Sequence, residues 1–212
     1  MTPLEARLAL SQDEIEQLRE FREMAVDINR RHNLYSRSSV SDFWSRHVLH
    51  SLSLASRAFP AGARVVDWGT GGGLPGIPLA IVFPDVEFIL VDVIEKKVRA
   101  AATMARRLGL QNVEAVATRA EDFDRPYHYA VSRATAPLAD LWTWTLRNLQ
   151  PMEVPPGHWN ARLLALKGGD LRGEVQSLVA IDEALIVETH PLSDLLPVRD
   201  FAEKVIVTVD HR

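Results

Sequence analysis

The stretch VVDWGTGGGLPGIPLAI, residues 65 to 81, decides the fold. A short apolar run ends in the acid Asp67, and a loop rich in glycine follows directly. Glycine lets the backbone turn sharply and lets a ligand lie close against it. Pro75 and Pro78 suit the first turn of a helix, where a missing N–H costs nothing. The stretch therefore predicts a strand, a ligand-binding turn and a helix in succession.

Strands and helices alternate beyond this stretch. Short apolar or β-branched runs predict strands, and the longer segments between them predict helices. The predicted strands are RVVDW (64–68), VEFILVD (86–92), NVEAVAT (112–118), HYAVSRA (128–134), RLLALKG (162–168), LIVETH (185–190) and KVIVTVD (204–210), with helices at 76–83, 94–109, 137–149 and from Gly169 to about Ala184. Alternation of this kind is typical of parallel βαβ units with right-handed crossovers. We therefore predict a doubly wound, mostly parallel seven-stranded α/β sheet, closed by an antiparallel pair.

Two further helices precede the first predicted strand. Residues 12 to 33 carry apolar side chains at helical spacing, with Ser11 and Glu14 as a capping box. After a polar break, a second helix is predicted from Ser41, Asp42 or Phe43 to about Ser56. We therefore divide the one compact fold into an N-terminal helical extension, residues 1–60, and a core of residues 61–212.

Composition excludes several classes of protein. The chain of 212 residues has no cysteine, which rules out disulfides, thiolate zinc sites and thiol nucleophiles. No segment approaches the ~18 apolar residues of a membrane span, and the N-terminus lacks the apolar centre of a signal peptide. We therefore expect a monomer in the cytoplasm, with no membrane contact.

Charge is distributed unevenly. The net charge of −4 gives no global sign of nucleic-acid binding. Between Ile28 and Arg57, however, five arginines and three histidines stand against one acid, Asp42. This local excess could face phosphates, although a solvated helix face would explain it equally well.

The loop after Asp67 favours a cationic ligand. Gly71, Gly73 and Gly76 match GxGxxG, but the first glycine of a dinucleotide motif should directly follow the strand, which it does not here. An acid is also unfavourable beside a pyrophosphate. Asp67, Gly69, Gly71 and Gly73 instead form an acid-x-G-x-G-x-G pattern, which suits the sulfonium and amino groups of S-adenosylmethionine. The alternative is that the glycines only form a tight turn after the strand and bind no ligand.

The next two strand ends fit the same cofactor. Ligands of open parallel sheets lie beyond the carboxyl ends of the strands. Asp92 ends the second strand, where doubly wound nucleotide folds hold a carboxylate for ribose. Ala120 and Glu121 follow the third, where their backbone could contact adenine. Asp92 as a helix cap and Glu121 as a surface acid remain alternatives.

Seven motifs occur along the chain in this order: NLYS, RHVLHSL, DWGTGGGLPGIPLAI, LVDVIEKKVRA, TRAEDF, VSRATAPL and LALKGG. In these motifs the chain resembles the RsmG (GidB) family of small-subunit ribosomal RNA methyltransferases. The resemblance implies a Rossmann-like class I methyltransferase that methylates guanosine N7 in 16S ribosomal RNA, with the RNA or the small ribosomal subunit as its partner. It implies that Gly69, Leu74, Ala120, Glu121 and Arg133 contact S-adenosylmethionine, and that Asn33, His47, Arg133 and Lys167 surround the methyl-transfer pocket. The chain departs from the family pattern at Tyr35 and at His50, where a threonine and an acid are usual.

Transfer to guanine N7 needs no general base, because N7 has an available lone pair. The enzyme must supply alignment and a pocket poor in water. Arg133 follows a buried-looking strand and could hold guanine O6, a phosphate or the cofactor's carboxylate, whereas a structural ion pair is the alternative. Lys167, before two glycines, suits phosphate or O6. His47 and His50 lack nearby acids, so we expect no metal site. For His47 two alternatives stay open, a contact with RNA or the pocket and plain packing within the fold.

The tryptophans are expected mainly in the core, with Trp68 and Trp159 as the better candidates for stacking on a nucleotide.

Three other functions stay open from the residues alone. These are a methyltransferase of a small molecule or protein, an NAD-dependent oxidoreductase, and a noncatalytic RNA-binding protein.

Overall fold

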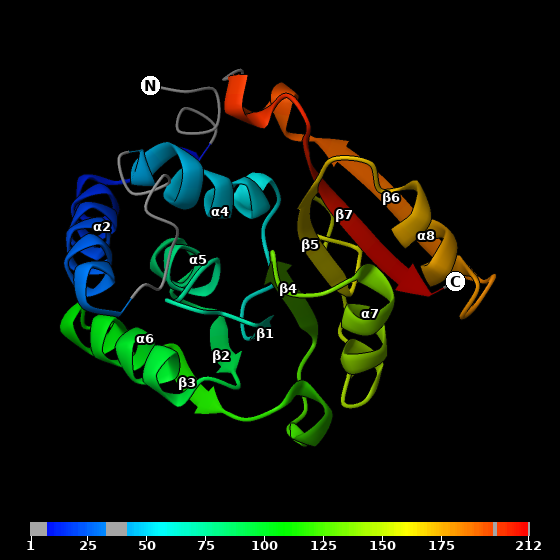
Figure 1. Cartoon of the computed structure of the whole chain (residues 1–212), viewed down its shortest axis with the longest axis horizontal. Coiled ribbons are helices and arrows are strands. Elements are labelled where there is room, and N and C mark those ends of the chain that lie inside the picture. The colour runs from blue at the N-terminus through cyan, green and yellow to red at the C-terminus, as the bar shows by residue number, and fades with distance from the viewer. Residues whose placement is uncertain (1–7, 33–41, 197–198, 212) are drawn as a thin grey trace.

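The computed structural model describes residues 8–32, 42–196 and 199–211 of the chain (Figure 1). Their centre is a seven-stranded sheet in the order β3-β2-β1-β4-β5-β7-β6. The strands are β1 (Arg64–Trp68), β2 (Glu87–Asp92), β3 (Val113–Ala117), β4 (Tyr129–Arg133), β5 (Leu163–Gly168), β6 (Leu185–Pro191) and β7 (Lys204–His211). The first five pair in parallel, and β7 runs antiparallel to both β5 and β6. The seven predicted strands and their closing antiparallel pair are confirmed.

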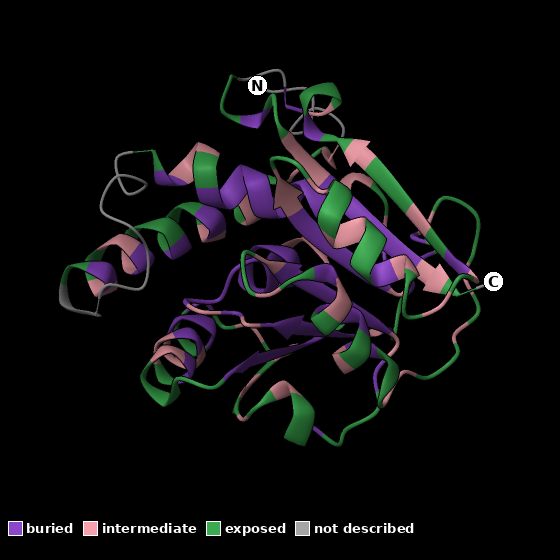
Figure 2. Ribbon diagram, turned by 45° about the vertical axis from the view of Figure 1, so that its right-hand side comes forward, coloured by how far each residue is buried: buried purple, intermediate pink, exposed green. Residues whose placement is uncertain are grey.

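Helices cover both faces of the sheet, so its strands are mostly buried (Figure 2). Side chains alternate between the faces, with Val65 and Val131 in one core cluster and Val66 and Ala130 in the other. The helices are α2 (Gln12–His32), α4 (His50–Leu52), α5 (Gly76–Val82), α6 (Glu95–Arg107), α7 (Leu138–Leu146) and α8 (Arg172–Val179). Short helical turns lie at η1 (Trp44–Leu49), η2 (Ser53–Ser56), η3 (Ala120–Asp122), η4 (Leu192–Asp194) and η5 (Arg199–Phe201). No helix in these described ranges is long and apolar enough to cross a membrane.

The helix α2 begins with the predicted capping box. The Ser11 hydroxyl accepts the Glu14 backbone N–H at 3.2 Å, and the Glu14 carboxylate accepts the Ser11 N–H at 2.7 Å. Leu18 and Phe21 are buried in the core cluster that also contains residues of α5 and α6, and α2 lies beside both helices (Figure 1). The N-terminal helices thus share the core of the sheet.

The second predicted helix is helical but not uniformly α. Residues 44–49 form a π-helix, residues 50–52 an α-turn and residues 53–56 a 3₁₀ turn. The hydroxyls of Ser51 and Ser53 donate to the carbonyls of His47 and His50, so side chains take up acceptors within this segment. The last predicted helix is also shorter, because α8 ends at Val179 and a turn follows in which Asp182 accepts the Ala184 N–H.

Asn112 fastens the far end of α5 to the start of β3. Its side-chain amide donates to the carbonyl oxygens of Ala80, Phe83 and Val86, each at 3.0 Å. The amino end of α5 carries the glycine loop, so this anchor helps to fix the helix on which the loop depends.

Replacing Asn112 with alanine should lower the free energy of unfolding by about 1–3 kcal/mol, because partly buried carbonyls lose their donor. Urea denaturation measures this change. The control is Gln111→Ala, since the exposed Gln111 donates only to the Gly109 carbonyl within its own turn. Equal stability of the two variants would contradict the anchoring role.

Candidate functional site

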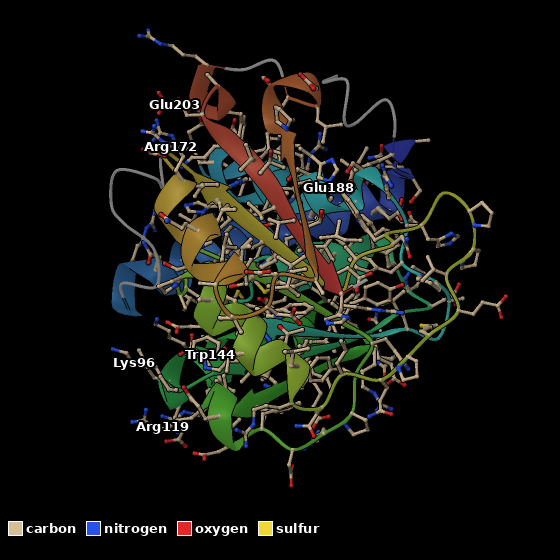
Figure 3. All side chains as sticks on the ribbon, turned by 90° about the vertical axis from the view of Figure 1, so that its right-hand side faces the viewer. Lys96, Arg119, Trp144, Arg172, Glu188 and Glu203 are labelled. Carbon is tan, nitrogen blue, oxygen red and sulfur yellow. The ribbon has the colours of Figure 1, made fainter. Side chains whose placement is uncertain are left out.

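The loops that follow β1, β2, β4 and β5 meet at the carboxyl edge of the sheet, as its parallel topology requires. Residues next to this edge lie along one side of the molecule, where Figure 3 labels Lys96, Arg119, Arg172 and Glu203. The glycine loop of residues 69–75 leaves β1 here, and α5 begins directly after it.

A buried carboxylate holds the glycine loop. Asp67 is 0% exposed, and its Oδ2 accepts the Thr70 hydroxyl at 2.7 Å and the Gly76 N–H at 2.9 Å. Burial raises the pKa of Asp67 to about 7, against the opposing effect of these hydrogen bonds. Its other oxygen, Oδ1, is buried without a hydrogen-bond partner among the described residues. The predicted acid therefore lies beneath the loop and fixes both of its ends.

The loop glycines fall into two kinds. A Cβ at Gly69, Gly73 or Gly76 would collide with Thr135, Ile77 or Leu90, and Gly69 and Gly73 also have a φ of +68° and +90°. Packing therefore requires these glycines. Gly71 also has a positive φ, +56°, but a Cβ there would meet nothing closer than 4.0 Å. The backbone at Gly71 is open to a ligand.

Asp92 joins the glycine loop to the end of β2. Its Oδ2 accepts the Gly71 N–H at 2.9 Å, and its Oδ1 accepts the Ile94 N–H at 2.9 Å. The second bond closes a turn two residues along the chain, but α6 begins at Glu95 with Ile94 as its N-cap and no side-chain cap, so the helix-cap alternative for Asp92 is wrong. Val93 and Ile94 follow with exposed fractions of 61% and 39%. The sequence reasoning missed this apolar pair, although two aliphatic residues directly after a strand-ending acid were a usable signal.

The third strand end is more open. Ala120 and Glu121 lie in η3, and Glu121 is exposed. The Glu121 carboxylate accepts the indole N–H of Trp144 at 3.0 Å. This bond orients Glu121, which was predicted to be either a cofactor contact or a surface acid. The side chain of Leu74, in contrast, is 3% exposed in the core, so a cofactor contact there would come from its backbone.

A cavity of about 480 Å³ opens beside the ends of β4 and β5. It brings together three predicted site residues, His47, Arg133 and Lys167. Asn33, the fourth, lies outside the described residues. The full lining consists of Arg46, His47, His50, Arg133, Ala134, Leu166, Lys167, Gly168, Asp200, Phe201 and Lys204.

Arg133 and His47 form a hydrogen-bonded pair in the cavity wall. The Arg133 Nη1 lies 2.9 Å from the His47 Nδ1 and 3.4 Å from the Arg46 carbonyl oxygen. Burial, followed by the charges of Arg133 and Arg46, lowers the pKa of His47 to about 3. A guanidinium can only donate, so Nδ1 of the neutral imidazole accepts and its proton resides on Nε2. The pair therefore presents a positive charge on Arg133 alone.

Two hydrogen bonds hold the Lys167 ammonium in place. Its Nζ donates to the Ala136 carbonyl at 2.6 Å and to the Glu174 carboxylate at 2.7 Å, with only 11% of its side chain exposed. Glu174 also accepts the Leu138 N–H at 3.0 Å. Lys167 thus lines the cavity while it is paired with an acid from α8.

Several lining residues were missed by the sequence reasoning. His50 was not predicted to line the pocket, and Asp200, Phe201 and Lys204 reach the cavity from the C-terminal end of the chain. Their placement depends on the pairing of β7 with β5, for which no local sequence signal exists. Within the described ranges, no three potential metal ligands gather in one place.

Two stacking candidates prove to be core residues. Trp68 is 1% exposed and donates to the Thr145 hydroxyl, while Trp159 is 3% exposed and donates to the Leu54 carbonyl. The expectation that the tryptophans lie mainly in the core is confirmed for both, and the alternative of stacking on a nucleotide is wrong, because apolar packing and a satisfied indole N–H fix each ring inside. Arg57, at the end of the basic stretch, lies over the Trp159 ring at 5.3 Å rather than at the cavity.

The sheet order and the glycine loop define a class I, S-adenosylmethionine-dependent methyltransferase fold. Solved structures with this fold include a SAM-dependent methyltransferase from Aquifex aeolicus, with a TM-score of 0.56 and 16% identity over 82% of this chain and 97% of that one. Another is the ribosomal protein L11 methylase from Lactobacillus delbrueckii subsp. bulgaricus, with a TM-score of 0.56 and 15% identity over 79% of each chain.

The family follows from sequence comparison. The family model GidB, described as rRNA small subunit methyltransferase G, matches residues 14–188. A ribosomal RNA small subunit methyltransferase G from Salinibacter ruber is 50% identical over 95% of this chain and 94% of its own length. A protein of the same name from Bacteroides fragilis is 43% identical over 78% of this chain and 80% of its own length. The chain belongs to the GidB family of rRNA small subunit methyltransferases.

Gly76→Ala should destabilise the chain by about 1–3 kcal/mol, because a methyl group would press on Leu90 and on the Asp67 carboxylate. The disturbed loop should also bind S-adenosylhomocysteine more weakly. Urea denaturation and calorimetric titration measure the two effects. Gly173→Ala is the matched control, since a Cβ in that helix meets open space and alanine should stabilise it by about 0.5–1 kcal/mol. Two variants of equal stability would disprove the role of the loop packing.

His50 should make stability depend on pH. Burial, followed by the charges of Arg133, Lys204 and His47, lowers its pKa from 6.5 to about 3. Between these values the unfolded chain binds a proton that the folded chain does not, so stability falls with falling pH. Between pH 6 and pH 4 the free energy of unfolding should fall less steeply in His50→Gln than in the unaltered chain. The difference between the two slopes should be about 1.4 kcal/mol per pH unit.

Urea denaturation at pH 4, 5, 6, 7 and 8 measures this slope. Above pH 7 both the folded and the unfolded chain carry a neutral imidazole, so the two curves should run parallel there. Curves that stay parallel down to pH 4 would refute the depressed pKa.

Proposed function

We propose that this chain transfers a methyl group from S-adenosylmethionine to N7 of a guanosine in 16S ribosomal RNA of the small subunit. The observation that carries the proposal is the cavity at the carboxyl edge, where Arg133, Lys167 and His47 converge at the ends of β4 and β5. Membership of the GidB family supports the substrate class, and the class I fold supports the cofactor.

The residues of the loop fit the proposed cofactor. The open backbone at Gly71 leaves space against the loop, and the unpartnered Oδ1 of Asp67 is a buried acceptor close by. Asp92, with the exposed Val93 and Ile94, offers a carboxylate for ribose hydroxyls and apolar surface for adenine. We assign cofactor binding to Asp67, Gly69, Gly71, Gly73, Leu74, Asp92, Ala120, Glu121 and Arg133. When bound, S-adenosylmethionine supplies an electrophilic methyl group.

The residues of the cavity would hold the target base and exclude water. Arg133 offers guanidinium donors for guanine O6, which leaves N7 free to attack. His47 orients Arg133 through its 2.9 Å contact, and its neutral imidazole adds no competing charge. Lys167 supplies a second cation at the end of β5. Asn33 completes the proposed set. None of these groups needs to remove a proton, so alignment is their main contribution.

The basic stretch from Ile28 to Arg57 would meet RNA phosphates, and its Arg46 already lines the cavity. A substrate presented by the assembled small subunit suits a chain whose net charge is −4. A cytoplasmic location follows from this substrate and from the absence of cysteine. The monomeric state stays a prediction.

Labelled S-adenosylmethionine and small subunits from cells that lack this protein test the proposal, with deproteinised RNA in parallel. The expected result is label at N7 of one guanosine, with a rate reduced about a hundredfold or more in Arg133→Ala. The control is Arg64→Ala, because Arg64 lies at the opposite end of β1, paired with Glu87. Cofactor binding without label in either RNA would overturn the substrate and favour a small molecule or protein.

A further inference from the structure

Lys204 reaches the cavity from the strand that closes the sheet. It is the first residue of β7 and lies opposite Gly168, the last residue of β5. A Cβ on Gly168 would lie 2.7 Å from the Lys204 Cδ and 2.9 Å from its Nζ. Gly168 does not have a positive φ, so its backbone does not demand glycine. The missing side chain instead gives the lysine its path across the end of β5 and into the cavity.

The other cavity cations have partners on the protein. Arg46 lies 3.0 Å from the Asp200 carboxylate and Lys167 lies 2.7 Å from Glu174, while Arg133 contacts His47. The carboxylates therefore already neutralise two of these charges.

Lys204 is different, because its backbone pairs with β5 while its ammonium has no hydrogen bond or ion pair with any residue in the described part of the chain. It is half-buried, and the nearby His50 is neutral. An ammonium that lines a cavity without an anion beside it attracts an anion that enters the cavity and can donate to it. The arrangement therefore favours an anionic ligand at the β7 side of the cavity.

We propose that Lys204 binds a phosphate of the RNA strand next to the target guanosine, which rests on the proposed function. The other anion available to this site is the carboxylate of S-adenosylmethionine. Two strands, β4 and β5, separate β7 from β1, which places Lys204 about 14 Å across the sheet from the strand that carries the glycine loop. That distance favours the RNA phosphate, which would fix the nucleotide while Arg133 contacts its base.

Salt dependence of binding tests this assignment, because each phosphate contact releases counterions. Small subunits from cells lacking this protein are titrated with the full chain at several potassium chloride concentrations. Lys204→Gln should weaken binding about three- to tenfold near 0.1 M salt and make the slope of log K against log[salt] shallower by about 0.7–0.9. Lys204→Arg, which keeps the charge, should retain the slope of the original chain.

The matched control is Arg125→Gln, which removes one positive charge beside Glu114, near the opposite edge of the sheet. It should leave the slope unchanged, and S-adenosylhomocysteine should bind all variants equally. An unchanged slope in Lys204→Gln overturns the proposal, and so does weaker S-adenosylhomocysteine binding in that variant, which would assign the lysine to the cofactor. Methyl transfer by the unaltered chain is measured on the same subunits. Absence of that transfer would mean that the proposed function fails, whereas transfer with an unchanged slope in Lys204→Gln would mean that only the role of Lys204 fails.

Discussion

The site depends on one buried carboxylate, that of Asp67. Its Oδ2 receives hydrogen bonds from Thr70 near the start of the glycine loop and from Gly76 at its end. Asp92 adds a third bond from the neighbouring strand, to the Gly71 N–H. Glycine loops have many accessible conformations, so an unheld loop would pay a large entropic cost on binding a ligand. Two carboxylates at adjacent strand ends remove most of that freedom before any ligand arrives.

The same residues explain why the loop tolerates so little change. Gly69, Gly73 and Gly76 leave no room for a Cβ, whereas Gly71 faces open space. Packing therefore specifies three of these glycines, whereas the positive φ of Gly71, +56°, accounts for the fourth and its open side leaves room for a ligand. The sequence motif alone does not separate these reasons, because acid-x-G-x-G-x-G is the same pattern in either case.

Local patterns predicted much of the fold. Each strand was found from its own apolar run, and the capping box at Ser11 and Glu14 was visible because both partners are three residues apart. Positions at strand ends also predicted that Arg133 and Lys167 would meet, since parallel strands end at one edge. The boundary between residues 1–60 and 61–212 stays a prediction, and α2 shares the core with α5 and α6.

Features set by distant contacts escaped prediction. The π-helix at residues 44–49 has no clear signature in its sequence. Asp200 and Lys204 enter the cavity only because β7 pairs with β5. Sequence separation of this size leaves no periodic pattern to detect.

The departure at His50 now has a physical consequence. An acid at this buried position would face the charges of Arg133 and Lys204, the two charged side chains that lower the pKa of His50 most. It would neutralise part of the positive charge in the cavity wall. A neutral imidazole leaves that charge available, because its pKa of about 3 keeps it uncharged near neutral pH. The cavity therefore keeps its excess of positive charge for an anion supplied from outside, and the Lys204 ammonium, which has no acidic partner in the described chain, is placed to meet one.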